Sequence, residues 1–89
     1  MLPYLSKDDI KIGMSVRTYQ LANIYDTHFL IAEPKLVEDD SGFRCITEGT
    51  VVFIGDEQDA EYWKIRNKYA NDNKKILALV NTDYDGVIV

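Results

Sequence analysis

The sequence contains few of the residues on which several classes of protein depend. Its 89 residues include one cysteine and one histidine. No disulfide can therefore close within the chain, and a zinc site made by one chain is not expected. No apolar run approaches the roughly 18 residues of a membrane span, and the chain opens Met1-Leu2-Pro3 without a basic and then apolar leader. These absences predict a soluble, cytoplasmic protein.

Positive charge is also scarce. Ten Lys and Arg stand against fifteen Asp and Glu, which gives a net charge of −5. This field opposes binding to nucleic-acid phosphates or anionic lipid, so we expect partners that are proteins or are basic. Hydrophobic residues make up 46% of the chain, as in ordinary globular domains. The length predicts one domain over residues 1–89.

The first part of the chain predicts strands separated by turns. Ser6 and the acids after it indicate one helical turn, followed by a strand over residues 14–21. Residues 27–36 form a second β-prone run. Pro34 places the end of that run at a sheet edge or a bulge, because proline cannot donate to the strand ladder.

A hairpin and a helix are predicted next. The turn at residues 38–42 joins the second run to an antiparallel strand beginning at Phe43. Residues 43–54 form either one long strand bent at Gly49 or two strands that turn there. Asp56 is a plausible N-cap for a helix over residues 57–70, whose acids come first and whose cations follow.

The last part of the chain predicts two more strands. Residues 75–80 indicate a buried strand, residues 83–86 a turn and residues 87–89 a short final strand. Five or so short strands with one helix indicate a mainly β, or α+β, antiparallel domain of the small-barrel type.

This layout resembles that of SH3-like small barrels. The phrases that carry the resemblance are Lys11-Ile12-Gly13-Met14 and Gly49-Thr50-Val51-Val52, together with the hairpin and the late turn. The resemblance implies a strongly bent, five-stranded sheet whose loops bind peptides, proteins or nucleic acid. The helix at 57–70 is longer than the single turn usual in that family, and no aromatic peptide-binding motif of the family is present. No site residue is therefore transferred.

Motifs for metal binding and catalysis are incomplete. Residues 81–88 match the start of a calcium-binding EF-hand loop, but the glutamate required at its twelfth position is missing, and a hairpin turn explains the same residues. His28 shares a strand face with Leu30 and Ala32, which favours a half-exposed or core imidazole. Cys45 is interpreted as a small buried hydrophobe rather than a reactive thiol. The sequence therefore predicts no enzyme activity, no cofactor, no metal site and no small-molecule substrate.

The predicted helix carries the most informative pattern. An apolar arc of about 160° contains Tyr62, Trp63, Ile65, Tyr69 and Ala70, and Arg66 lies within it. In one interpretation the aromatic residues cover the sheet while Arg66 lies along Trp63 or pairs with a carboxylate. In the other, the arc is partly exposed and binds a partner, because Trp, Tyr and Arg are enriched in binding hot spots. With only one branched aliphatic residue in the arc, we expect Trp63 to be partly exposed.

Two functions follow from these observations. The leading hypothesis is a non-enzymatic module that binds another protein, or a second copy of itself, through Tyr62, Trp63, Arg66 and Tyr69. The alternative is an acidic inhibitor or nucleic-acid mimic that occupies a basic groove of a nucleic-acid-processing enzyme. The acidic clusters at 38–40 and 56–61 motivate the alternative, although −5 is a modest charge for mimicry.

Overall fold

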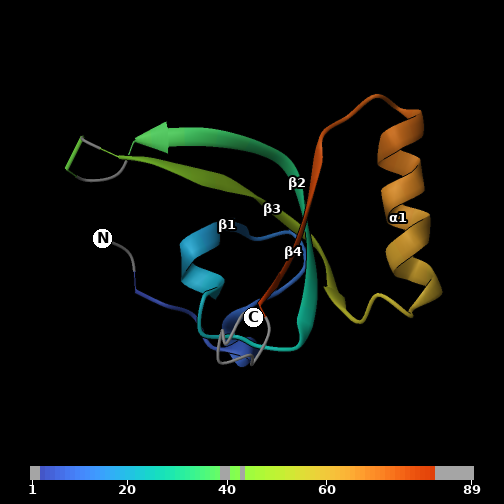
Figure 1. Ribbon diagram of the computed structural model, residues 1–89, viewed down its shortest axis with the longest axis horizontal. Helices are drawn as coiled ribbons and strands as arrows, with labels where there is room; N and C mark the ends of the chain where they lie inside the picture. Colours follow the sequence, from blue (N-terminus) through green and yellow to red (C-terminus); the bar gives the residue numbers. More distant parts are fainter. Residues whose placement is uncertain (1–2, 39–40, 43, 82–89) are drawn as a thin grey trace, which may run out of the picture.

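A four-stranded antiparallel sheet and one helix form the described part of the molecule (Figure 1). The computed structural model describes residues 3–38, 41–42 and 44–81. Its strands are β1 (Ser15–Arg17), β2 (Thr27–Glu38), β3 (Cys45–Gly55) and β4 (Ile76–Asn81), and its α-helix is α1 (Ala60–Asn71). Two short 3-10 helices, η1 (Lys7–Asp9) and η2 (Thr18–Leu21), lie near the start of the chain.

The strands are arranged in the order β1-β3-β2-β4. All neighbouring pairs are antiparallel, and β1 and β4 are the two outer strands. Within the described residues the sheet has four strands and stays open. The mainly β, α+β class and the β2–β3 hairpin are thus confirmed, whereas the prediction of about five strands in a closed barrel is not met. The turn and strand predicted at 83–89, and most of the calcium-like motif, lie outside the described residues.

Two bulges bend the long β2–β3 hairpin. Leu30 pairs with Phe53 but Ile31 pairs with Val51, and a second shift falls between Ala32 and Lys35. The second bulge contains Pro34, as predicted, because an irregular position does not need its missing N–H. Its first residue, Glu33, has a φ of 51° and donates its N–H to the Lys75 carbonyl at 3.0 Å.

Gly49 lies in β3 beside this second bulge. A Cβ at this position would overlap the Ile31 side chain and lie 2.9 Å from the Ala32 carbonyl oxygen. The glycine therefore allows the two backbones to approach closely while β3 continues through it. Of the two alternatives for residues 43–54, the single bent strand is correct.

Apolar side chains cover both faces of the sheet. On one face Val16, Leu21, Phe29, Ile31 and Val51 form the main core beneath the N-terminal segment. On the other face the side chains of Leu30 and Phe53 pack against Tyr62 of α1. Strand alternation and the extra residue at the first bulge divide these side chains between the two faces. The helix is thus a cover for the second face, and its own outer side is free of the sheet.

Two predicted segments differ from the structure in their local conformation. The run at 14–21 extends for only three residues as β1 and then turns into η2, where Gln20 Oε1 accepts the N–H of Arg17 at 3.0 Å. The helix begins at Ala60, not at residue 57. Asp56 does not cap it, because residues 56–59 form a turn in which the Asp59 N–H donates to the Asp56 carbonyl at 3.0 Å. Asp59 is the N-cap residue instead.

The outer end of the hairpin corrects the interpretation of Cys45. Strand β4 pairs with β2 only as far as Ala32, so residues 35–38 and 45–47 project beyond the rest of the sheet (Figure 1). Cys45 is exposed there, and Leu36 is 71% exposed. The prediction of a buried Cys45 is wrong, because no helix or strand among the described residues covers either face of the sheet at this end. Strand β4 is also only half-buried, with Ala78 and Val80 exposed, rather than fully buried as predicted.

Candidate protein-binding surface

The four predicted partner-binding residues lie on α1 with different exposures. Tyr62 is 3% exposed and faces the sheet, whereas Trp63 is 48% exposed. Arg66 and Tyr69 are half-buried. The partial exposure predicted for Trp63 is therefore confirmed, and the apolar arc is divided between a buried side and a side that reaches solvent.

Tyr62 is the buried base of this surface. Its ring meets Phe53 of β3, His28 of β2 and Trp63 edge-to-face, with centroid distances of 5.5, 5.7 and 5.2 Å. Edge-to-face arrangements place the positive edge of one ring against the negative face of the other. Tyr62 thereby fixes the start of α1 on the sheet and packs against the ring of Trp63.

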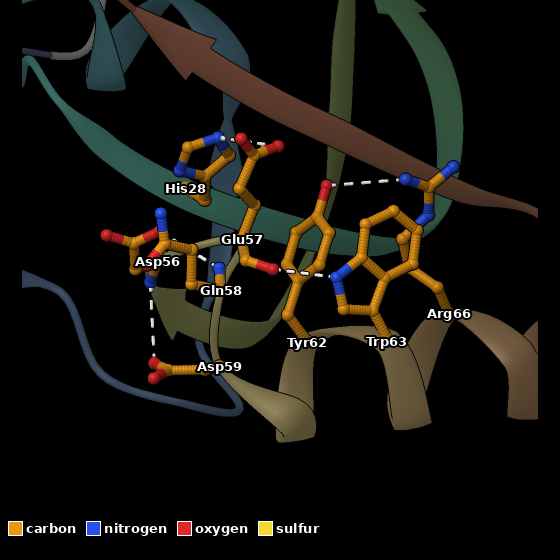
Figure 2. A network of polar contacts seen from close by, with 8 residues as sticks. All are labelled: His28, Asp56, Glu57, Gln58, Asp59, Tyr62, Trp63 and Arg66. Carbon is orange, nitrogen blue, oxygen red and sulfur yellow. Dashed lines mark hydrogen bonds and ion pairs between the residues drawn. The ribbon is translucent and has the colours of Figure 1, made fainter.

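Trp63 is held by the turn that precedes the helix (Figure 2). Its indole N–H donates to the Glu57 main-chain carbonyl at 2.7 Å. The turn itself is ordered by its own acids, since Asp56 Oδ1 accepts the N–H of Gln58 at 3.0 Å. Because its nitrogen is already satisfied, the exposed part of the indole presents ring carbon and π-surface to solvent.

Arg66 lies against both aromatic rings. Its Cζ is 5.1 Å from the centroid of Trp63 and 5.6 Å from that of Tyr62, within the range of cation–π attraction. Its Nη1 also donates to the Tyr62 hydroxyl at 3.4 Å (Figure 2). No carboxylate within the described part of the chain pairs with it. Of the two partners suggested by the sequence, Arg66 therefore has the indole and not an acid.

Tyr69 is not part of this cluster. Within the described residues, no ring contact or hydrogen bond joins its side chain to Tyr62, Trp63 or Arg66. Its main-chain carbonyl accepts the N–H of Lys74 at 2.9 Å and so helps to end the helix. We define the anchor surface as the exposed side of Trp63 with Arg66, supported by Tyr62.

His28 and Glu57 lie at the edge of the anchor surface, and the sequence alone did not bring them together. His28 Nε2 is 3.7 Å from Glu57 Oε2, and the His28 Nδ1 atom is buried with no hydrogen-bond partner among the residues that the structure describes. This contact follows from the register of β2 against β3, in which His28 pairs with Gly55, two residues before Glu57. Knowledge of that register would have predicted it. Glu57 thus makes two contacts: its carboxylate lies near His28 of β2, and its main-chain carbonyl accepts the indole N–H of Trp63 (Figure 2).

Other possible sites are less developed in the described residues. No group of three or more His, Cys, Asp or Glu side chains among them could hold a metal ion. A depression of about 510 Å³ lies on the side of the N-terminal segment, lined by Tyr4, Leu5, Ser6, Lys7, Asn23, Ile24 and Tyr25. None of the helices among the described residues is long and apolar enough to cross a membrane.

Comparison of the chain with protein-family models, with curated proteins and with solved structures gives no match. Its function is therefore inferred from its own side chains.

Proposed function

We propose that this protein is a small non-enzymatic module that binds another protein chain through the anchor surface. The observation that carries the proposal is that Trp63 is both exposed and fixed. Nearly half of its surface reaches solvent, while its ring is held by the Glu57 carbonyl, by Tyr62 and by Arg66.

A fixed aromatic side chain is well suited to binding. Association normally costs about 0.5–1.5 kcal/mol for each flexible side chain that must be ordered. Trp63 and Arg66 already restrict each other before a partner arrives, so much of this cost is avoided. Trp and Arg are also among the residue types that most often dominate binding free energy.

The arrangement of the acidic clusters favours this function over acidic mimicry. Glu38 lies opposite Cys45 at one end of β3, whereas Asp56 follows Gly55 at the other end. Eleven strand residues separate these ends, which corresponds to about 30 Å along the strand. Glu38, the described member of the first cluster, therefore does not combine with the acids at 56–61 into one continuous acidic face of the kind that a nucleic-acid mimic would need.

The proposal is tested by capture of a partner from a lysate of the native host, with the full chain immobilised. The comparison is between the wild type, Trp63→Ala and Leu36→Ser, which removes a still more exposed apolar side chain at the far end of the hairpin. We expect a captured protein that is lost with Trp63→Ala, is retained with Leu36→Ser, and persists when salt is raised. Capture that is unaffected by Trp63→Ala, or that disappears with salt alone, contradicts the proposal.

A further inference from the structure

We propose that the chain that docks on the anchor surface is a second copy of this protein, with the two α1 helices antiparallel. This inference rests on the proposed function and names its partner. The contact is isologous, so both halves of it are described residues of one chain. The proposal is supported by the distribution of charge around α1, by the spacing of large and small residues on one stripe, and by the weakness of the ion pairs that the acidic end makes within the described residues.

Charge is segregated between the two ends of α1. The acidic end contains Asp56, Glu57, Asp59 and Glu61, whereas the basic end contains Lys68, Lys74 and Lys75 together with one acid, Asp72. All eight residues are exposed. When two such helices lie antiparallel, the acidic end of each meets the basic end of the other.

The acidic end has only weak cationic partners among the described residues. Asp56 and Asp59 accept backbone N–H groups and pair with no cation among the described residues. Glu57 is 3.7 Å from an imidazole, and its side chain remains 59% exposed. Glu61 reaches Lys64 only at 4.0 Å, with both side chains mostly in solvent. The acidic end can therefore accept cations from a second copy without breaking a strong pair.

The stripe that contains Trp63 is self-complementary in size as well as in charge. Trp63 and Ala70 are seven residues apart, and positions at this spacing lie on the same side of a helix. A two-fold axis between Arg66 and Asn67 places Trp63 of one copy over Ala70 of the other. The exposed methyl of Ala70 leaves room for an indole. The same axis brings Asp59, the N-cap residue of one helix, to the end of the other helix that Lys74 follows, and it places Glu61 opposite Asp72.

The size of the contact sets its strength. The twelve residues of α1 span about 18 Å, so one helix pair buries less surface than a stable, obligate dimer requires. We therefore expect a reversible dimer that forms at high protein concentration.

The test is sedimentation equilibrium of the full chain at low salt from about 10 µM to about 1 mM, a range that covers weak association. The wild type should show a monomer–dimer equilibrium, and Trp63→Ala should raise its dissociation constant about tenfold or more. A basic-end variant (Lys74→Glu with Lys75→Glu) and an acidic-end variant (Glu57→Lys with Glu61→Lys) should each stay monomeric alone. Mixed together, the two should form a heterodimer, because each restores the charge that the other lacks.

Matched controls separate this contact from a general effect of charge. Lys7→Glu with Lys11→Glu, and Asp8→Lys with Glu38→Lys, make the same changes of charge at exposed positions away from α1, and both should dimerise like the wild type. If the acidic-end variant does not give the wild-type circular dichroism spectrum, Glu57→Gln with Glu61→Gln replaces it and should also weaken the dimer. A wild type that stays monomeric, or variants that do not associate when mixed, overturn the proposal. Capture that depends on Trp63 would then still support binding to a different protein.

Discussion

The indole nitrogen of Trp63 donates a hydrogen bond of 2.7 Å to the main-chain carbonyl of Glu57, six residues earlier in the chain. The acceptor belongs to the backbone of the turn before α1, so changes of side chain at position 57 preserve it. The bond fixes the orientation of a ring that is 48% exposed. An exposed apolar ring whose polar group is already satisfied gains more from contact with another apolar surface than from contact with water.

We expect Trp63→Phe to lower the free energy of unfolding by about 0.5–1.5 kcal/mol, because phenylalanine cannot donate to the Glu57 carbonyl. The measurement is urea unfolding followed by circular dichroism, since the variant has no tryptophan to report by fluorescence. Tyr25→Phe, at a position 49% exposed, is the control and should change stability little. Equal stability of Trp63→Phe and the wild type would show that the hydrogen bond contributes nothing.

Arg66→Ala should lower the free energy of unfolding by about 0.5–2 kcal/mol, through loss of the cation–π contacts and of packing by the side-chain stem. Arg66→Lys should recover part of this loss, because an ammonium group keeps the charge but not the planar contact. Lys64→Ala removes a cation whose side chain is 79% exposed and should have almost no effect. If Arg66→Ala and Lys64→Ala have equal free energies of unfolding in urea, the contact between Arg66 and the indole does not stabilise the fold.

The sequence predicted local features well where one residue type dictates the backbone. Pro34 predicted a sheet edge or a bulge, and a bulge is present; Ser6 correctly predicted one turn of helix. The exposure of Trp63 was also predicted, because its helix face had too few branched aliphatic residues to be wholly buried. Each of these inferences depends on residues close together in the chain.

Features that depend on distant contacts were predicted less well. The exposure of Cys45 follows from how far β1 and β4 extend along the hairpin, which strand patterns do not report. The start of α1 was placed early because Asp56 and Asp59 are both good capping residues, and hydrogen bonds within the turn decide between them. The approach of Glu57 to His28 required the register of β2 against β3.

Gly49→Ala should destabilise the fold by about 2 kcal/mol, because the added Cβ would overlap Ile31 and lie 2.9 Å from the Ala32 carbonyl oxygen. A carbonyl in a paired strand cannot move aside without disturbing the ladder. Gly42→Ala is the comparison, since no described residue lies within 4 Å of the added atom and the cost expected there comes from its φ of 73°. Thermal unfolding should rank Gly49→Ala as the less stable of the two, and the reverse order would refute the close approach.

The pKa of Asp9 should lie below its ordinary value. The Ser6 backbone N–H and then the Ser6 hydroxyl donate to this carboxylate, at 3.1 and 2.9 Å, and both stabilise its charged form. The resulting stabilisation is present above the pKa of the unfolded chain and is lost as pH falls through the lower pKa of the folded state. An NMR titration should show the pKa rising partway in Ser6→Ala, which keeps the N–H donor. Ser15→Ala should leave the Asp9 titration unchanged, and a Ser6→Ala titration that matches the wild type would contradict this assignment.

The most direct test of the anchor surface is acrylamide quenching of Trp63, the only tryptophan in the chain. The measurement compares the dilute monomer with the complex formed with a captured partner or a second copy. We expect red-shifted, readily quenched emission from the monomer and clear protection in the complex, because binding covers the exposed side of the indole. A blue-shifted, protected indole in the monomer, or equal quenching in both states, would contradict the role of Trp63 as the binding anchor.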